Sequence, residues 1–214
     1  MQEITIPTAT HGRILVGESR ETGPLRLLAG FHGYAQSADE MMTMLRDIPG
    51  AASWTVMSVQ ALHRFYRGRS DVTVASWMTR QDRELVIGDN VAYVDAAIAR
   101  VAGGREIERL VFFGFSQGVA MAFRAGGLGA RKADAVLALG GDVPPELLAD
   151  SAVAFPRVLL ARGARDEWYP DSKLRADEAR LRGRGAHVET LTFDGAHEWH
   201  ADFGIRAAAV LLSL

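Results

Sequence analysis

The sequence lacks cysteine altogether in its 214 residues, which excludes disulfide bonds, thiolate metal sites and a cysteine nucleophile. It also lacks a large excess of charge. The formal net charge is -2, so the chain has no strong field to attract nucleic acid or an anionic membrane surface. Its longest apolar runs are far shorter than a membrane span. We therefore expect no nucleic-acid partner and no insertion into a membrane.

Segments that would divide the chain or direct its export are also missing. No repeat, low-complexity segment or linker rich in Pro, Gly or Ser interrupts the sequence, so we expect residues 1–214 to form a single domain. The first residues, MQEITIPTATHGRI, lack a basic start followed by an apolar run, so they are not typical of a secretory signal. We expect a cytoplasmic protein, and the absence of cysteine is compatible with that setting.

The sequence does contain a regular alternation of short apolar runs and longer amphipathic ones. The apolar runs are apolar throughout, which is typical of strands buried on both faces. Strands of this kind separated by helices indicate an α/β fold, a three-layer α/β/α sandwich around a mostly parallel sheet. Strands are expected over 24–31, 53–62, 109–115, 133–141, 157–163 and 187–193, and helices over 37–48, 82–104, 117–126, 171–185 and 197–214.

Three further segments carry weaker or more local signals. Ser37, with Glu40 three residues later, predicts a capping box at the start of the first helix. Residues 1–19 contain two short β-like runs around THG and are expected to form a hairpin. Residues 63–81 have no clear period and are interpreted as a long excursion between a strand and a helix.

A serine lies at the joint between an expected strand and an expected helix, in the pattern G-x-S-x-G of Gly114, Ser116 and Gly118. This pattern in this context is typical of a nucleophile elbow, a tight turn that lifts the serine hydroxyl above the sheet at a helix N-terminus. The alternative is an ordinary serine that caps the helix. A reactive serine needs a base, and the base needs an orienting acid, in the chain order Ser, Asp or Glu, His.

The base is expected at His197, in a loop of small residues between the last strand and the last helix. His200, three residues later, is the weaker candidate. The acid is expected at Asp166, in the loop after the strand at 157–163. Asp142, one strand earlier, is its main rival, and Asp194 is interpreted as a turn residue. A structural ion pair of Asp166 with Arg162 or Arg165 is the alternative to a catalytic role.

An oxyanion hole needs two backbone N–H donors. We expect them at Gln117, directly after the nucleophile, and at Tyr34, in the loop after the strand at 24–31, where Gly33 allows a close approach. His32 is interpreted as a structural support of that loop.

The excursion at 63–81 is expected to cover the site, and Trp77 fits a core position equally well. The expected substrate-pocket residues are Phe65, Tyr66, Trp77, Met78 and Trp168.

The GFSQG elbow at residues 114–118, with the preceding His32-Gly33 loop and the later Asp166 and His197, resembles the phospholipase/carboxylesterase family of small α/β-hydrolases. That family includes acyl-protein thioesterases and bacterial carboxylesterases. The resemblance spans nearly the whole chain, and Trp77 matches a family position before the long helix. It implies an α/β-hydrolase fold with a minimal cap or none.

The resemblance also implies the roles of the matched residues: Ser116, Asp166 and His197 as the triad, and Tyr34 and Gln117 as the oxyanion donors. The chain departs from the family pattern only in positions that line the site. Val119 stands where the family usually has glycine, Ala35 and Gln36 replace the second glycine and the aspartate of the H-G loop, Arg162 replaces the histidine of the acid loop, and Ala196 replaces the glycine before His197.

These residues together predict a serine carboxylesterase that hydrolyses small to medium acyl esters through an acyl-enzyme intermediate, with no metal and no cofactor. A lysophospholipase or an acyl-thioesterase with the same triad is the alternative within enzymes. A non-catalytic binding module on a hydrolase fold is the alternative of another class. The expected partner is a small-molecule ester, and the sequence is compatible with either a monomer or a homodimer.

Overall fold

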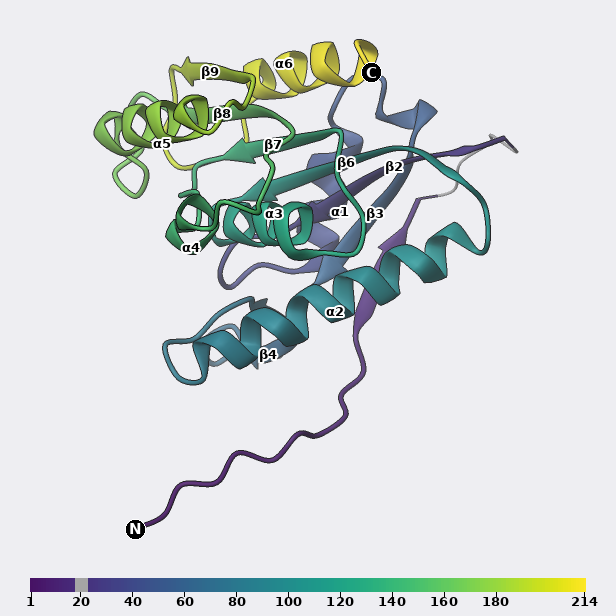
Figure 1. Ribbon diagram of the computed structural model, residues 1–214, viewed down its shortest axis with the longest axis vertical. Coiled ribbons are helices and arrows are strands. Elements are labelled where there is room, and N and C mark those ends of the chain that lie inside the picture. The colour runs from purple at the N-terminus through teal and green to yellow at the C-terminus, as the bar shows by residue number, and fades with distance from the viewer. Residues whose placement is uncertain (18–22) are drawn as a thin grey trace.

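A computed structural model describes residues 1–17 and 23–214. Its centre is a seven-stranded sheet in the order β1-β3-β2-β6-β7-β8-β9 (Figure 1). Only β1 runs antiparallel, against β3, and the other neighbours pair in parallel. The strands are β1 (Arg13–Val16), β2 (Leu25–Phe31), β3 (Thr55–Gln60), β6 (Ile107–Phe115), β7 (Ala135–Leu139), β8 (Arg157–Gly163) and β9 (Val188–Phe193).

Helices cover both faces of this sheet. On one face α1 (Ala38–Arg46) and α6 (Ala201–Leu212) join a core that includes Val111 and Phe113 of β6. On the other face α2 (Arg83–Ala102), α3 (Gln117–Leu128) and α5 (Asp171–Gly183) join a core that includes Leu110 and Phe112. Successive residues of β6 thus enter opposite cores, which explains why the strand is apolar throughout. The predicted α/β/α sandwich is confirmed.

The predicted capping box is confirmed at the start of α1. The Ser37 N–H donates to Glu40 Oε2 at 2.7 Å, and the Glu40 N–H donates to Ser37 Oγ at 3.3 Å. Two short helices that the sequence did not predict, η1 (Ala51–Ser53) and α4 (Pro145–Ala149), lie in the connections before β3 and after β7. Within the described ranges, no helix is long and apolar enough to cross a membrane.

The predicted N-terminal hairpin is wrong. Residues 1–12 form no helix or strand, and β1 pairs with Met57–Gln60 of β3 instead of with a neighbouring segment. The β-like signal at Arg13–Val16 was correct, but its partner is remote in sequence, which a local pattern does not reveal. Residues 18 and 19 of the predicted hairpin lie outside the described residues.

The excursion at 63–81 contains regular structure that its sequence did not indicate. The strands β4 (His63–Tyr66) and β5 (Thr73–Ser76) form an antiparallel hairpin. This hairpin is tied to the loop after β2, because the Ala75 N–H donates to the Gln36 carbonyl at 2.9 Å and the Ala35 N–H donates to the Ala75 carbonyl at 3.1 Å. The hairpin therefore holds the loop in which Tyr34 lies.

Candidate active site

Ser116 lies on the turn between β6 and α3, with φ 53° and ψ -119°. This region of φ is unfavourable for a residue with a side chain and costs about 1–3 kcal/mol, so the surrounding structure must enforce it. The Ser116 N–H donates to the Leu139 carbonyl of β7 at 2.8 Å, which anchors the turn. The Ser116 side chain makes no capping hydrogen bond to α3. The serine is therefore displayed by the turn and does not serve as a helix cap.

The two glycines of the elbow allow helix and strand to approach closely. A Cβ atom on Gly118 would overlap the Phe31 carbonyl of β2, and a Cβ atom on Gly114 would overlap the Gly118 carbonyl. Each overlap is with backbone, which cannot rotate out of the way as a side chain can. The first turn of α3 therefore packs directly on the end of β2, and this contact fixes the turn that carries Ser116.

His197 joins Ser116 to Asp166. Its Nε2 atom lies 2.8 Å from Ser116 Oγ, and its Nδ1 atom lies 2.8 Å from Asp166 Oδ2. A carboxylate only accepts hydrogen bonds, so Nδ1 carries the ring proton and Nε2 is free to accept from the serine hydroxyl. The three residues follow β6, β8 and β9, whose carboxyl ends lie at one edge of the sheet.

The loop after β8 holds the Asp166 side chain rigidly. Asp166 is 3% exposed, and its Oδ1 atom accepts from the Trp168 and Tyr169 N–H groups, both at 2.9 Å. Arg162, which replaces the family histidine, donates to the carbonyls of Tyr169, Ala164 and Asp166. It braces the loop without pairing with the carboxylate, so Oδ2 is left for His197.

The rival residues have other partners. Asp142 accepts from Lys173 at 3.1 Å, and both side chains are largely exposed. Asp194 forms a surface ion pair with Arg165, so Arg165 does not pair with Asp166. His200 caps α6, where its Nδ1 atom accepts from a backbone N–H of the first turn. In the described part of the chain, none of the three rivals forms a hydrogen bond with Ser116.

The loop after β2 lies against the nucleophile. A Cβ atom on Gly33 would lie 2.9 Å from Gln36 Oε1 and 3.2 Å from Ser116 Cβ, so a larger residue would require its neighbours to shift. The buried His32 ring supports the loop, with Nδ1 2.7 Å from the Gly33 carbonyl and Nε2 accepting from the Ala61 N–H at 3.1 Å. Burial lowers the pKa of the His32 imidazole, which keeps it neutral. Among the described residues, no backbone acceptor pairs with the N–H of Tyr34.

The side chains of two glutamines have positioning roles that the sequence did not predict. Gln36 Oε1 accepts from the Gly33 N–H at 2.7 Å, so this glutamine braces the loop where the family has aspartate. Gln117 Oε1 accepts from the Trp77 N–H at 2.9 Å, and its Nε2 donates to Ser76 Oγ at 3.1 Å. Gln117 thereby fastens the end of the β4–β5 hairpin to the elbow. In the sequence, the one indication of a role for Gln36 was that it replaces the aspartate of the family pattern.

A cavity of about 370 Å³ opens beside Ser116. Two of the expected pocket residues, Met78 and Trp168, line it. Three others do not: Trp77 is 1% exposed and packs against Phe31, Phe65 packs against the Tyr34 ring, and Tyr66 is exposed. Trp77 therefore occupies a core position and not a pocket position, and its Nε1 donates to the His32 carbonyl at 2.8 Å.

Val119, the residue in place of the family glycine, points away from this cavity. Its side chain is fully buried and is not part of the cavity lining. It packs closely beneath Gly141, because a Cβ atom on Gly141 would lie 2.7 Å from Val119 Cβ. The larger side chain is accommodated by a glycine on the next loop, so the elbow keeps its shape.

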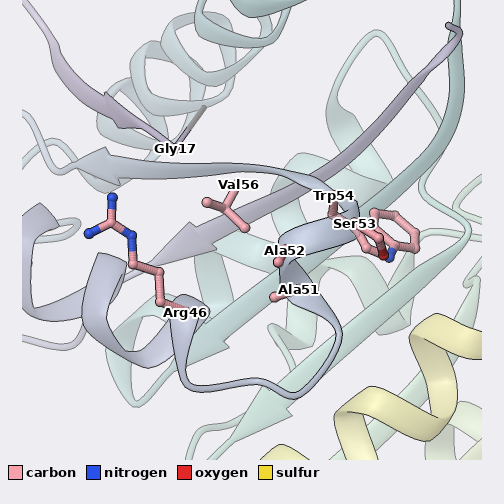
Figure 2. A pocket seen from close by; sticks show the side chains of 7 residues that line it. All are labelled: Gly17, Arg46, Ala51, Ala52, Ser53, Trp54 and Val56. Carbon is pink, nitrogen blue, oxygen red and sulfur yellow. The ribbon is translucent and has the colours of Figure 1, made fainter. Parts of the chain in front are cut away.

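A larger cavity, of about 750 Å³, lies at the opposite edge of the sheet (Figure 2). Figure 2 shows its lining near the amino end of β3, including Arg46, Trp54 and Val56. Among the described residues, its lining holds no nucleophile with a neighbouring base, so the smaller cavity is the candidate site. In residues 1–17 and 23–214, no group of three or more His, Asp or Glu side chains is placed to hold a metal ion.

An open, mostly parallel sheet with a serine on the turn after β6, an aspartate after β8 and a histidine after β9 defines the α/β-hydrolase fold. Solved structures show the same fold. No protein-family model matches the sequence, and no curated protein matches it in a sequence search.

Three similar solved structures cover nearly the whole chain. Esterase PE8 has 22% identity over 94% of this chain and 97% of its own, with a TM-score of 0.71. The phospholipase/carboxylesterase from Dyadobacter fermentans has 19% identity over 96% and 99%, with a TM-score of 0.71. Acyl-protein thioesterase 2 from Zea mays has 16% identity over 95% and 99%, with a TM-score of 0.68. These structures are an esterase, a phospholipase/carboxylesterase and an acyl-protein thioesterase, the kinds of protein whose motifs this sequence resembles.

Proposed function

We propose that this protein is a serine hydrolase of carboxylic esters, a carboxylesterase for small to medium acyl groups. The observation that carries the proposal is the continuous chain of hydrogen bonds from Ser116 Oγ through His197 to Asp166, with the serine held at φ 53°. The names of the similar solved structures, which include esterases and a thioesterase, support ester hydrolysis on this fold.

In the proposed reaction, His197 Nε2 takes the proton from Ser116 Oγ as the oxygen attacks the ester carbonyl carbon. The N–H groups of Tyr34 and Gln117 stabilise the resulting oxyanion. The tetrahedral intermediate collapses, the C–O bond to the alcohol breaks, and the imidazolium gives its proton to the leaving alkoxide. Water, deprotonated by His197, then attacks the acyl-enzyme and releases the acid and the free serine. Asp166 holds the ring orientation throughout.

The alternatives differ in what the cavity accepts. A thioesterase or a lysophospholipase would use the same three residues, but the cavity beside Ser116 is small and contains charged side chains, which favours short acyl groups. Comparing kcat/KM for short and long acyl chains separates these activities. A binding module without catalysis would have no need for an aligned serine, histidine and aspartate.

The substitution Ser116→Ala tests the proposal. Removing the nucleophile should lower hydrolysis of p-nitrophenyl butyrate by roughly a thousand-fold or more, while circular dichroism and the thermal midpoint stay close to wild type, because the hydroxyl supports no other part of the fold. Turnover by a folded Ser116→Ala protein at the wild-type rate would contradict the assignment.

A further inference from the structure

The cavity beside Ser116 contains a buried cation on the same helix as the elbow. Gln117, Ala120 and Arg124 of α3 all line it, and their spacing of three and four residues places them on one helix face. Arg124 is 5% exposed. Its Cα lies about 12 Å along the axis from that of Ser116. Long side chains on a helix lean toward its N-terminus, and Arg124 and Ser116 line the same cavity.

This guanidinium is paired with a carboxylate along one side only. Arg124 Nε and Nη2 both contact Glu146 Oε1, at 2.8 and 2.7 Å, while Arg83 Nη2 contacts Glu146 Oε2 at 2.9 Å. Arg83 also pairs with Glu84, through its Nη1 atom at 2.8 Å, so the two arginines share two carboxylates. Glu146 occupies only the Nε and Nη2 side of the Arg124 guanidinium. Burial acts to raise the pKa of Glu146, but its hydrogen bonds, including those from the two arginines, lower it overall, so Glu146 is ionised at neutral pH.

The other charged side chains that line the cavity do not pair with Arg124. Lys173 and Asp142, which also line the cavity, pair with each other at 3.1 Å. Within residues 1–17 and 23–214, Arg124 Nη1 has no hydrogen-bond partner. Glu146 is not part of the lining, so the cation and not its partner faces the cavity. An alkyl chain bound here would cover the Nη1 group without giving it an acceptor, which is costly, whereas a carboxylate would accept its hydrogen bonds.

We propose that the preferred substrate is an ester that itself carries a carboxylate, and that Arg124 binds this carboxylate. This inference rests on the proposed function, since it names the substrate class of the same site. The carboxylate belongs either to the acyl part, as in a half-ester of a short dicarboxylic acid, or to the alcohol part. In both cases Arg124 determines specificity and takes no part in the proton transfers at Ser116.

Matched pairs of esters test the proposal. On the acyl side, p-nitrophenyl hemiglutarate is compared with p-nitrophenyl valerate, which has the same chain length without the charge. On the alcohol side, 4-acetoxybenzoate is compared with 4-acetoxybenzamide. In one of the two pairs we expect the wild type to have the higher kcat/KM for the anionic ester. In Arg124→Met the ratio of anionic to neutral kcat/KM should fall by about ten- to a hundred-fold.

Arg83→Met is the matched control, because Arg83 also pairs with Glu146 but does not line the cavity, and it should keep the wild-type ratio.

If Arg124→Met does not fold, calorimetry provides a test that does not need this variant. Glutarate should bind the wild type and Ser116→Ala, and pentanamide should not. Equal kcat/KM for both members of each pair together with absent glutarate binding would overturn the inference, as would an unchanged ratio in folded Arg124→Met. Absence of hydrolysis of every ester with glutarate binding retained would instead contradict the proposed function.

Discussion

The reacting groups of the site and the lining of its cavity are built in different ways. Ser116, Asp166 and His197 follow three strands of one sheet. Backbone hydrogen bonds fix Ser116 and Asp166, and the side chains of these two residues hold the His197 ring. The lining comes from separate sources: Met78 follows the β4–β5 hairpin, and Arg124 lies two turns into α3. We therefore expect the sheet to determine what reaction the site can perform, and the hairpin and one helix face to determine which ester it accepts.

The largest expected effect separates the acid of the triad from an aspartate in the lining. Asp166→Asn keeps an oxygen for the Trp168 and Tyr169 N–H groups but presents an amide to His197, which favours the wrong ring tautomer. We expect kcat for a neutral ester to fall roughly ten-thousand-fold with little change in the thermal midpoint.

Asp142→Asn is the matched comparison, since Asp142 also follows a strand of the sheet but pairs with Lys173 on the surface. Its kcat for the same ester should stay within a few-fold of wild type. If the two variants lost activity equally, the acid would not be Asp166 alone, and the distinction between reacting groups and lining would fail.

A second, smaller effect compares two glycines of α3, one at the elbow and one beyond it. In Gly118→Ala the added methyl group would overlap the Phe31 carbonyl, so the free energy of unfolding should fall by about 1–3 kcal/mol or more. In Gly126→Ala the methyl group would lie 3.7 Å or more from its neighbours, an ordinary contact.

Urea denaturation measures both variants. Gly126→Ala should keep or raise stability, by up to about 1 kcal/mol, because alanine favours a helix over glycine. A Gly118→Ala protein as stable as Gly126→Ala would show that the close contact of α3 with β2 does not hold the elbow in place.

The smallest expected effect concerns His32, which supports the loop after β2 that contains Gly33 and Tyr34. Burial lowers the pKa of its imidazole below the ordinary value of 6.5, so the unfolded chain binds a proton more readily than the folded one. Above pH 6.5 His32 is neutral in both states, so its burial does not reduce the free energy of unfolding. As the pH falls below 6.5, the unfolded chain takes up the proton first and the free energy of unfolding decreases. In His32→Gln, the loss of unfolding free energy between about pH 7.5 and about pH 5.5 should therefore be smaller than in wild type.

The exposed His11→Gln variant is the control for this pH dependence and should follow the wild type. The same urea titrations at both pH values supply the comparison. A His32→Gln protein with an undiminished loss on acidification would mean that some other group is responsible.

Much of the fold was predictable because its signals are local. Continuous apolar runs identified β2, β6 and β8, and the capping box at Ser37 fixed the start of α1. The order of Ser116, Asp166 and His197 along the chain was also readable, because parallel strands place their carboxyl ends at one edge. The structure brings these three residues together by hydrogen bonds.

What could not be predicted depends on contacts that are remote in sequence. The partner of β1 is β3, and the short β4–β5 hairpin is held by the loop at Gln36, so neither shows a local pattern. The direction of Trp77 is fixed by its contacts with Phe31 and His32, which its position in the excursion does not reveal. Arg124 did leave a signal, since a lone charge in the apolar stretch MAFRAG needs a partner or a role.

Covalent labelling with a fluorophosphonate probe, followed by mass spectrometry of the peptides, shows whether Ser116 is an activated nucleophile. We expect a single phosphonyl group per chain on Ser116, formed much more slowly in His197→Ala because the base that activates the hydroxyl is missing. A folded protein that takes up no label, or that is labelled at other serines at the same rate as at Ser116, would contradict it.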